Sequence, residues 1–291
     1  MTDHFEVSDL KTAAKIVILE EYIDIYTTIM DSNWSGERWY IDSHAGTGRT
    51  KIRDYDTTID GSTIVALDNH TDSFDKFYFY ELDGASFEKL HETIADKFGY
   101  EFEVGPVRSE GEDFTVARCD DPYIRIMQTD SNKGMQFLAD HSNRNNHWFV
   151  FVDPKGLTAK RSTLDTLIDR SNLDLLVTYQ TSGAHRNTGD DANHAHDAME
   201  RTMGDEDWPD TDDRNDIAEA YKEKLEENES IRPVKKKELV NPNDKRMRFD
   251  LVFACENETA REIMKEDIMD QDDLWNKAND KVGQSGLDGF T

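Results

Sequence analysis

Apolar residues recur at helical spacing near the start of the chain and later gather in short, nearly uninterrupted runs. The first pattern predicts an amphipathic helix over residues 13–30, with apolar positions at Ile16, Leu19, Tyr22, Ile23, Tyr26 and Ile29. The second pattern predicts strands at 38–43, 76–82, 124–128, 148–152 and 173–179. Helical segments are expected between them at 62–67, 86–98, 132–141 and 162–171, with a polar loop over 49–60. Alternating strands and helices, with most strands apolar on both faces, indicate a parallel sheet covered on both sides.

The pattern changes after residue 181. Residues 183–229 are polar and predict a loop with two helices, at about 192–203 and 214–229. A strand at 247–254 and a helix at 258–269 follow, and the glycine-bearing end predicts a loose tail. The fold class expected is therefore α/β, a doubly wound, mostly parallel sheet with a helical insertion after the fifth strand. In domain terms, residues 1–182 and 233–270 form the α/β domain, 183–232 the insertion and 271–291 the tail.

Composition adds a strong acidic bias. Asp and Glu number 62 against 34 Lys and Arg, the net charge is -28, and the mean hydropathy is -0.80. Disordered chains contain few aromatic residues, whereas this chain has 14 Phe, 10 Tyr and 5 Trp. We therefore expect a folded, halophilic protein whose acidic surface is screened by concentrated salt, with a Debye length of ~3 Å at 1 M.

Charge and cysteine content also limit partners and compartment. The negative charge does not favour binding to a nucleic-acid backbone, although a local basic strip such as Lys235–Lys237 is compatible with it. Cys119 and Cys255 are too far apart for a CxxC metal site and too few for a disulfide framework. No apolar run is long enough to span a membrane, and the polar N-terminus does not resemble a signal peptide. A cytoplasmic protein is expected, and its oligomeric state is left open.

Candidate chemistry lies at the predicted strand ends. The first strand ends at Asp42 and opens into Ser43-His44-Ala45-Gly46-Thr47-Gly48. Glycine permits close approach of a ligand to the main chain, although it also makes ordinary tight turns. The next strand ends lie at Glu81, Asp130 and Asp153-Pro154.

Ligands of open α/β sheets bind beyond the carboxyl ends of the strands. A nucleoside-bearing cofactor would need the glycine loop, a carboxylate for the ribose hydroxyls (Glu81) and a polar group for the adenine amine (Asp130). We therefore expect Asp42, Glu81, Asp130 and Asp153 to converge on one crevice above the sheet. Structural alternatives exist for each: Asp42 as a support of the loop, Glu81 as a solvated strand end and Asp130 as a helix cap.

This layout resembles class I S-adenosylmethionine-dependent methyltransferases, whose fold is Rossmann-like. The D-x-x-A-G-x-G motif at Asp42–Gly48 is similar to the first motif of adenine and ribosomal-RNA methyltransferases. A closer resemblance is to the three-Cys-motif partner family. It covers the leading helix from Lys15, YIDSHAGTG, Gly61-Ser62-Thr63, FVDPKG at 151–156 and the segment 249–265. This resemblance implies S-adenosylmethionine as cofactor and a three-cysteine protein as partner.

Residue roles follow from the resemblance. Asp42, Ala45, Gly46 and Gly48 would hold the methionine end of the cofactor, Glu81 the ribose and Asp130 the adenine side. Asp153 and Pro154 would form the catalytic position facing the methyl acceptor. Amino-methylating relatives carry a second proline and an aromatic ring after this position, whereas Lys155-Gly156 stands here. An inactive methyltransferase-fold partner of a three-Cys-motif protein is therefore the alternative.

A metal site is not expected. His185, His194, His196 and Asp197 lie close in sequence, but histidines two apart fall on different sides of a helix. The acidic run 205–216 lacks the central glycine of a calcium-binding loop.

Overall fold

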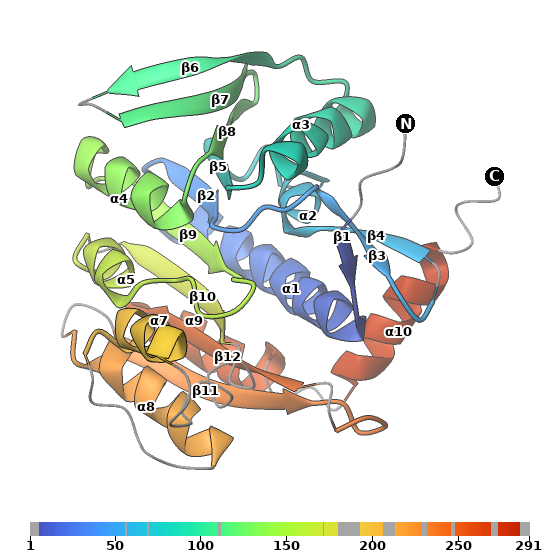
Figure 1. Cartoon of the computed structure of the whole chain (residues 1–291), viewed down its shortest axis with the longest axis vertical. Coiled ribbons are helices and arrows are strands. Elements are labelled where there is room, and N and C mark those ends of the chain that lie inside the picture. The colour runs from blue at the N-terminus through green and yellow to red at the C-terminus, as the bar shows by residue number, and fades with distance from the viewer. Residues whose placement is uncertain are drawn as a thin grey trace. The chain divides into compact units, whose positions relative to one another are not determined.

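The computed structural model describes residues 6–55, 57–68, 70–109, 112–170, 172–179, 193–205, 213–228, 232–245, 248–268 and 273–285. The chain divides into two units, one formed by Met1–Ser131 with Ile268–Thr291 and the other by Asn132–Asp267. Figure 1 labels their elements. None of the helices in the described ranges is long and apolar enough to cross a membrane.

The first unit contains a five-stranded run of sheet and a smaller three-stranded sheet. Its helices are α1 (Leu10–Asn33), α2 (Ser62–Asp68), α3 (Gly84–Phe98) and α10 (Leu274–Ser285). Its strands are β1 (Glu6–Ser8), β2 (Arg38–Asp42), β3 (Arg49–Ile52), β4 (Thr57–Asp60), β5 (Lys76–Glu81), β6 (Glu103–Ser109), β7 (Glu112–Asp120) and β8 (Tyr123–Gln128). The strand order is β2-β5-β8-β7-β6, with β2, β5 and β8 parallel and β8, β7 and β6 antiparallel. The predicted leading helix and the first three predicted strands are confirmed as α1, β2, β5 and β8.

The polar loop predicted over 49–60 is wrong, because β3 and β4 form an antiparallel hairpin there and β1 pairs in parallel with β3. Alternate residues of the two strands are buried: Thr50 and Ile52 on one, Thr57 and Ile59 on the other. Two of these four are threonines, so the strand period of two was hidden by a polar composition. Strands β6 and β7 were also not predicted.

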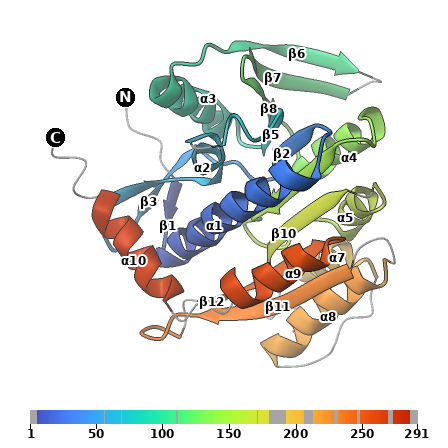
Figure 2. The ribbon, with the colours of Figure 1, turned by 180° about the vertical axis from the view of Figure 1, so that it is seen from behind.

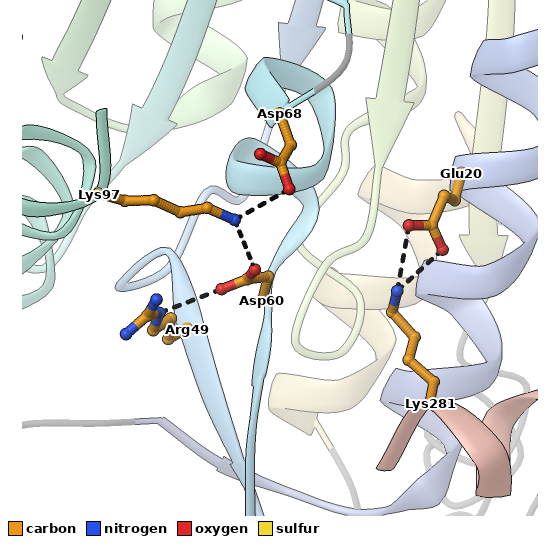
Figure 3. A network of polar contacts seen from close by, with 6 residues as sticks. All are labelled: Glu20, Arg49, Asp60, Asp68, Lys97 and Lys281. Atoms are coloured by element: carbon orange, nitrogen blue, oxygen red, sulfur yellow. Dashed lines mark hydrogen bonds and ion pairs between the residues drawn. The ribbon is translucent and has the colours of Figure 1, made fainter. Parts of the chain in front are cut away.

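The prediction of a loose C-terminal tail is wrong for residues 274–285, which form α10 beside α1 (Figures 1 and 2). Leu274, Ala278 and Val282 are spaced by one helical turn and are buried. Lys277 Nζ lies 2.7 Å from Glu21. Lys281 Nζ lies 2.8 Å from Glu20 (Figure 3), so two charge pairs link this helix to α1.

The second unit contains four strands with helices on both faces. Its elements are α4 (Ser131–His141), β9 (His147–Val152), α5 (Arg161–Ile168), β10 (Leu173–Tyr179), α7 (Asn193–Met203), α8 (Arg214–Glu226), β11 (Arg232–Val240), β12 (Arg248–Cys255), α9 (Glu258–Ile263) and a π-helical turn at Met264–Ile268. The strand order is β11-β12-β10-β9; β9 and β10 are parallel, and β12 is antiparallel to both of its neighbours. Helices α5, α7 and α8 lie on the face seen in Figure 1, and α9 on the face seen in Figure 2.

The two helices predicted after the fifth strand are confirmed as α7 and α8. Strand β11 was not predicted, and the basic trio at 235–237 lies in it. The protein is thus a mixed α/β fold in which parallel strands are continued by antiparallel ones. The insertion and the domain boundaries drawn from the sequence stay predictions.

A buried arginine organises the second unit. Arg170, only 5% exposed, donates to the carbonyl oxygens of Ala139 (2.8 Å) and Asn143 (2.7 Å). Its guanidinium lies 4.0 Å from the centre of the Trp148 ring. It therefore joins the end of α4 to the start of β9. Burial, and then the nearby charge of Arg144, lower the pKa of Arg170 to about 10, so it stays charged at neutral pH.

We expect Arg170→Ala to lower the free energy of unfolding by about 2–4 kcal/mol, because it leaves buried carbonyl oxygens unsatisfied. Urea unfolding followed by tryptophan fluorescence measures the change. Arg201→Ala, which removes an exposed arginine of the same unit, should leave the unfolding midpoint in place. Equal midpoints for both variants would contradict the role given to Arg170.

A second buried group links stability to pH. Burial lowers the pKa of His147 from 6.5 to about 4, even though Asp174 lies 3.9 Å away. At that distance no hydrogen bond forms between His147 Nε2 and Asp174 Oδ1. The effect of burial on the pKa of His147 therefore dominates. The folded state holds His147 neutral, while the unfolded chain takes up a proton below pH 6.5.

Protonation of His147 in the unfolded chain should cost the wild-type protein up to about 3 kcal/mol of stability as the pH falls from 6.5 to about 4. The variant His147→Gln should not show this part of the loss. Unfolding free energies of both proteins across this range measure the difference. Above pH 6.5 the two curves should run parallel. Parallel curves below it as well would show that His147 does not titrate as described.

Candidate cofactor-binding site

The loop after β2 is held by the carboxylate that precedes it. Asp42 ends β2 and is fully buried. Its Oδ1 accepts the main-chain N–H of His44 at 3.0 Å, and its Oδ2 accepts the hydroxyl of Ser62, the first residue of α2. Burial, and then the charge of Asp42, raise the pKa of Tyr40 on the same strand. Asp42 therefore fixes the start of the loop against α2.

Glu81, at the end of the neighbouring parallel strand β5, holds the middle of the same loop. Its Oε2 accepts the N–H of Gly46 at 2.9 Å and its Oε1 accepts the N–H of Asp83 at 2.8 Å. The structure thus brings Asp42 and Glu81 to one loop, and their convergence on a crevice above the sheet stays a prediction. Each oxygen of the Glu81 carboxylate has a second lone pair, so each can accept a further hydrogen bond.

The two loop glycines have a left-handed backbone. Gly46 has φ +62° and Gly48 has φ +79°. A Cβ at Gly48 would lie 3.1 Å from Leu90 Cδ1 and 3.2 Å from Thr93 Cγ2 of α3. The Gly48 carbonyl also accepts the N–H of Gly61 at 2.8 Å. Gly48 therefore lets the loop lie directly against α3 and the start of α2.

Ala45 is buried, and its N–H donates to the carbonyl oxygen of Tyr80 on β5 at 2.9 Å. In this structure Ala45 therefore anchors the loop to the sheet. Leu82, which follows the end of β5, is 68% exposed, the highest value among the large apolar residues described. Leu82 is thus an exposed apolar residue next to Glu81 in the sequence.

Asp130 follows β8, the next parallel strand. Thr129, beside it, donates its N–H to the carbonyl oxygen of Glu81 at 3.0 Å, so the ends of β5 and β8 are joined. Asp130 itself is half-buried and directly precedes α4. The contribution of Asp130 to a cofactor site stays a prediction.

Asp153 and Pro154 belong to the second unit, where they follow β9. The Asp153 carboxylate accepts a hydrogen bond from the fully buried hydroxyl of Thr178 on β10. Pro154 is buried and Lys155 is exposed. The structure places Asp153 at the end of a parallel strand, as predicted, and its convergence with Asp42 and Glu81 stays a prediction.

Sequence reasoning missed three residues of the first unit. From the sequence, Ser62 belongs to the start of a helix and to the Gly61-Ser62-Thr63 pattern, Leu82 to the end of a strand, and Glu6 to no motif. The contacts of Ser62 and Glu6 join segments far apart in the chain, so no local pattern announces them. Leu82 could have been found, because an apolar residue between two acidic ones at a strand end is a candidate for ligand contact.

Within the described residues, no group of three or more His, Cys, Asp and Glu side chains is arranged to hold a metal ion. His185 and the side chains of His194 and His196 lie outside the described residues.

The sequence matches no protein-family model and none of the curated proteins. Membership in the three-Cys-motif partner family is therefore not shown. Solved structures do resemble the chain. A Legionella pneumophila protein assigned to family model DUF519 shares 12% identity and a TM-score of 0.52, over 92% of this chain and 94% of that one. This likeness shows a shared fold.

Two methyltransferase structures are more distant. Trm1 from Pyrococcus horikoshii, in complex with S-adenosyl-L-methionine, has 14% identity and a TM-score of 0.43, over 90% of this chain and 60% of that one. Magnesium protoporphyrin IX methyltransferase from Synechocystis, with the same compound bound, has 9% identity and a TM-score of 0.40, over 83% and 81%. Both scores fall below 0.5, so the shared fold rests on the Legionella structure.

We expect Gly48→Ala to destabilise the protein by about 2–3 kcal/mol, because it combines an unfavourable backbone with contacts to Leu90 and Thr93. Gly99 provides a matched control: its φ is +75°, but a Cβ there would meet nothing within 4 Å. Gly99→Ala should cost only about 1 kcal/mol. Thermal and urea unfolding compare the two, and equal losses would show that Gly48 is not needed for the close approach to α3.

Proposed function

We propose that the protein is an S-adenosylmethionine-dependent methyltransferase. The observation that carries the proposal is the hydrogen bond from Gly46 N–H to the Glu81 carboxylate. It brings a carboxylate at the end of a strand to a loop whose two glycines have a left-handed backbone. Asp42, Ala45, Gly46 and Gly48 would hold the methionine end of the cofactor. Glu81 would accept the ribose hydroxyls, and Asp130 would meet the adenine side.

The surroundings of Glu81 support a nucleoside rather than a simple anion. Its two oxygens can each accept one more hydrogen bond, which suits a pair of ribose hydroxyls. The exposed apolar side chain of Leu82 lies next in sequence and suits the flat, apolar face of a base. A phosphate at this point would face a carboxylate, which disfavours a nucleotide.

Asp153 and Pro154 are proposed to face the methyl acceptor. When bound, the cofactor supplies an activated methyl group, so the protein has mainly to align the acceptor and receive its proton. Asp153, held by Thr178, would orient the acceptor or take that proton. Lys155 and Gly156 stand where amino-methylating relatives have a second proline and an aromatic ring that stacks on the base. Methylation of a nucleobase amine is therefore not favoured.

The alternative is a methyltransferase-fold binding partner of a three-Cys-motif protein, without turnover. It is favoured by the same Lys155-Gly156 sequence and by the net charge of -28. Both functions place the protein in the cytoplasm of a salt-adapted cell, where concentrated ions screen its surface.

Isothermal titration with S-adenosylmethionine in molar potassium chloride tests the proposal. We expect saturable binding by the wild-type protein. Glu81→Gln should weaken it about 10- to 100-fold, since it removes a charged acceptor of hydrogen bonds. Glu101→Gln makes the same chemical change at an exposed position of the same unit and should leave binding intact. A well-folded wild-type protein that binds no cofactor would favour the alternative.

A further inference from the structure

Strand β1 carries a second carboxylate to the glycine loop. β1 pairs in parallel with β3 in the register Glu6 to Thr50, and β3 begins directly after Gly48. The N-terminal strand is therefore fixed along the exit of the loop. The Arg53 N–H also donates to the carbonyl oxygen of Ser8 at 3.0 Å, which holds the far end of β1.

The side chain of Glu6 reaches Gly46 itself. Its Oε2 lies 3.0 Å from the point where a Cβ of residue 46 would stand, and the residue is half-buried. The N–H of Gly46 is already donated to Glu81. Gly46 thus lies between two carboxylates that come from strands 75 positions apart in the sequence (81 − 6).

This arrangement decides which charge the loop accepts at Gly46. The methionine end of the proposed cofactor carries both a carboxylate and an ammonium group. A cofactor carboxylate here would meet two negative side chains, whereas an ammonium group would be attracted to both.

Two basic groups near the exit of the loop pair with other carboxylates. Arg49 follows Gly48 directly, but its Nε is bound to Asp60 at 3.0 Å. Asp60 also accepts Lys97, which in turn reaches Asp68 (Figure 3). Arg49 and Lys97 are therefore both engaged with aspartates.

We infer that Glu6 is a cofactor-binding residue that receives the ammonium group of the methionine end. The inference rests on the proposed function and adds a residue outside the D-x-x-A-G-x-G motif to that site. It also gives β1 a role: the three-residue strand places one carboxylate against the loop.

The test compares Glu6→Gln with the wild-type protein by titration with three ligands. S-adenosylmethionine has the ammonium and the sulfonium, S-adenosylhomocysteine has only the ammonium, and 5′-methylthioadenosine has neither. We expect Glu6→Gln to weaken the affinity for S-adenosylmethionine and S-adenosylhomocysteine by about tenfold or more. The affinity for 5′-methylthioadenosine should stay unchanged. Glu81→Gln should weaken all three, and Glu101→Gln none.

Each other outcome overturns the assignment. A loss of affinity for S-adenosylmethionine alone would place the sulfonium, not the ammonium, beside Glu6. Equal losses for all three ligands would show that Glu6 only supports the loop, and no loss would remove it from the site. Failure of the wild-type protein to bind any of them would refute the proposed function instead. Circular dichroism of each variant confirms that it is folded.

Discussion

The hydrogen bond from Gly46 N–H to Glu81 is the contact on which the site depends. It joins the loop after β2 to the end of β5, and the Asp42 carboxylate fixes the same loop from the other side. A carboxylate can serve in this way because it accepts several N–H and O–H donors at once without needing a cation. The loop is consequently positioned before any ligand arrives, which lowers the entropic cost of binding.

Because acidic residues outnumber basic ones, single lysines on the surface pair with two carboxylates. Scarce lysines are shared between carboxylates: Lys97 reaches Asp60 and Asp68, and Lys277 reaches Glu21 and Asp273. Burial lowers the pKa of Lys97, but its hydrogen bonds to the two aspartates outweigh this and raise it overall. Such partly exposed pairs each contribute little to stability, and together they neutralise the local excess of negative charge.

Aromatic packing and a buried charge both contribute to the interiors of the two units. Aromatic residues fill the first unit, where Tyr40 packs edge-on against Phe74 and Phe79. In the second unit Arg170 stacks on Trp148 and satisfies carbonyl oxygens at the end of α4, a buried polar centre that the surrounding chain fully engages. A buried charge is tolerable there because its donors are paired.

The sequence by itself determined the elements with a clear period. Uninterrupted apolar runs such as 76–82 and 148–152 can only be buried strands or buried helices, and their length decided for strands. It also determined the glycine-bearing loop after the first strand and the carboxylates at the strand ends. It failed where composition hid the pattern, as in the threonine-bearing hairpin at 49–60 and in α10.

Tertiary structure alone decided which distant groups meet. The contacts of Glu81 with Gly46, of Glu6 with the same residue and of Ser62 with Asp42 depend on strand order and register, which local spacing does not encode. Because parallel strands become neighbours only through long crossover connections, the residues at their ends carry no mark of one another in the sequence.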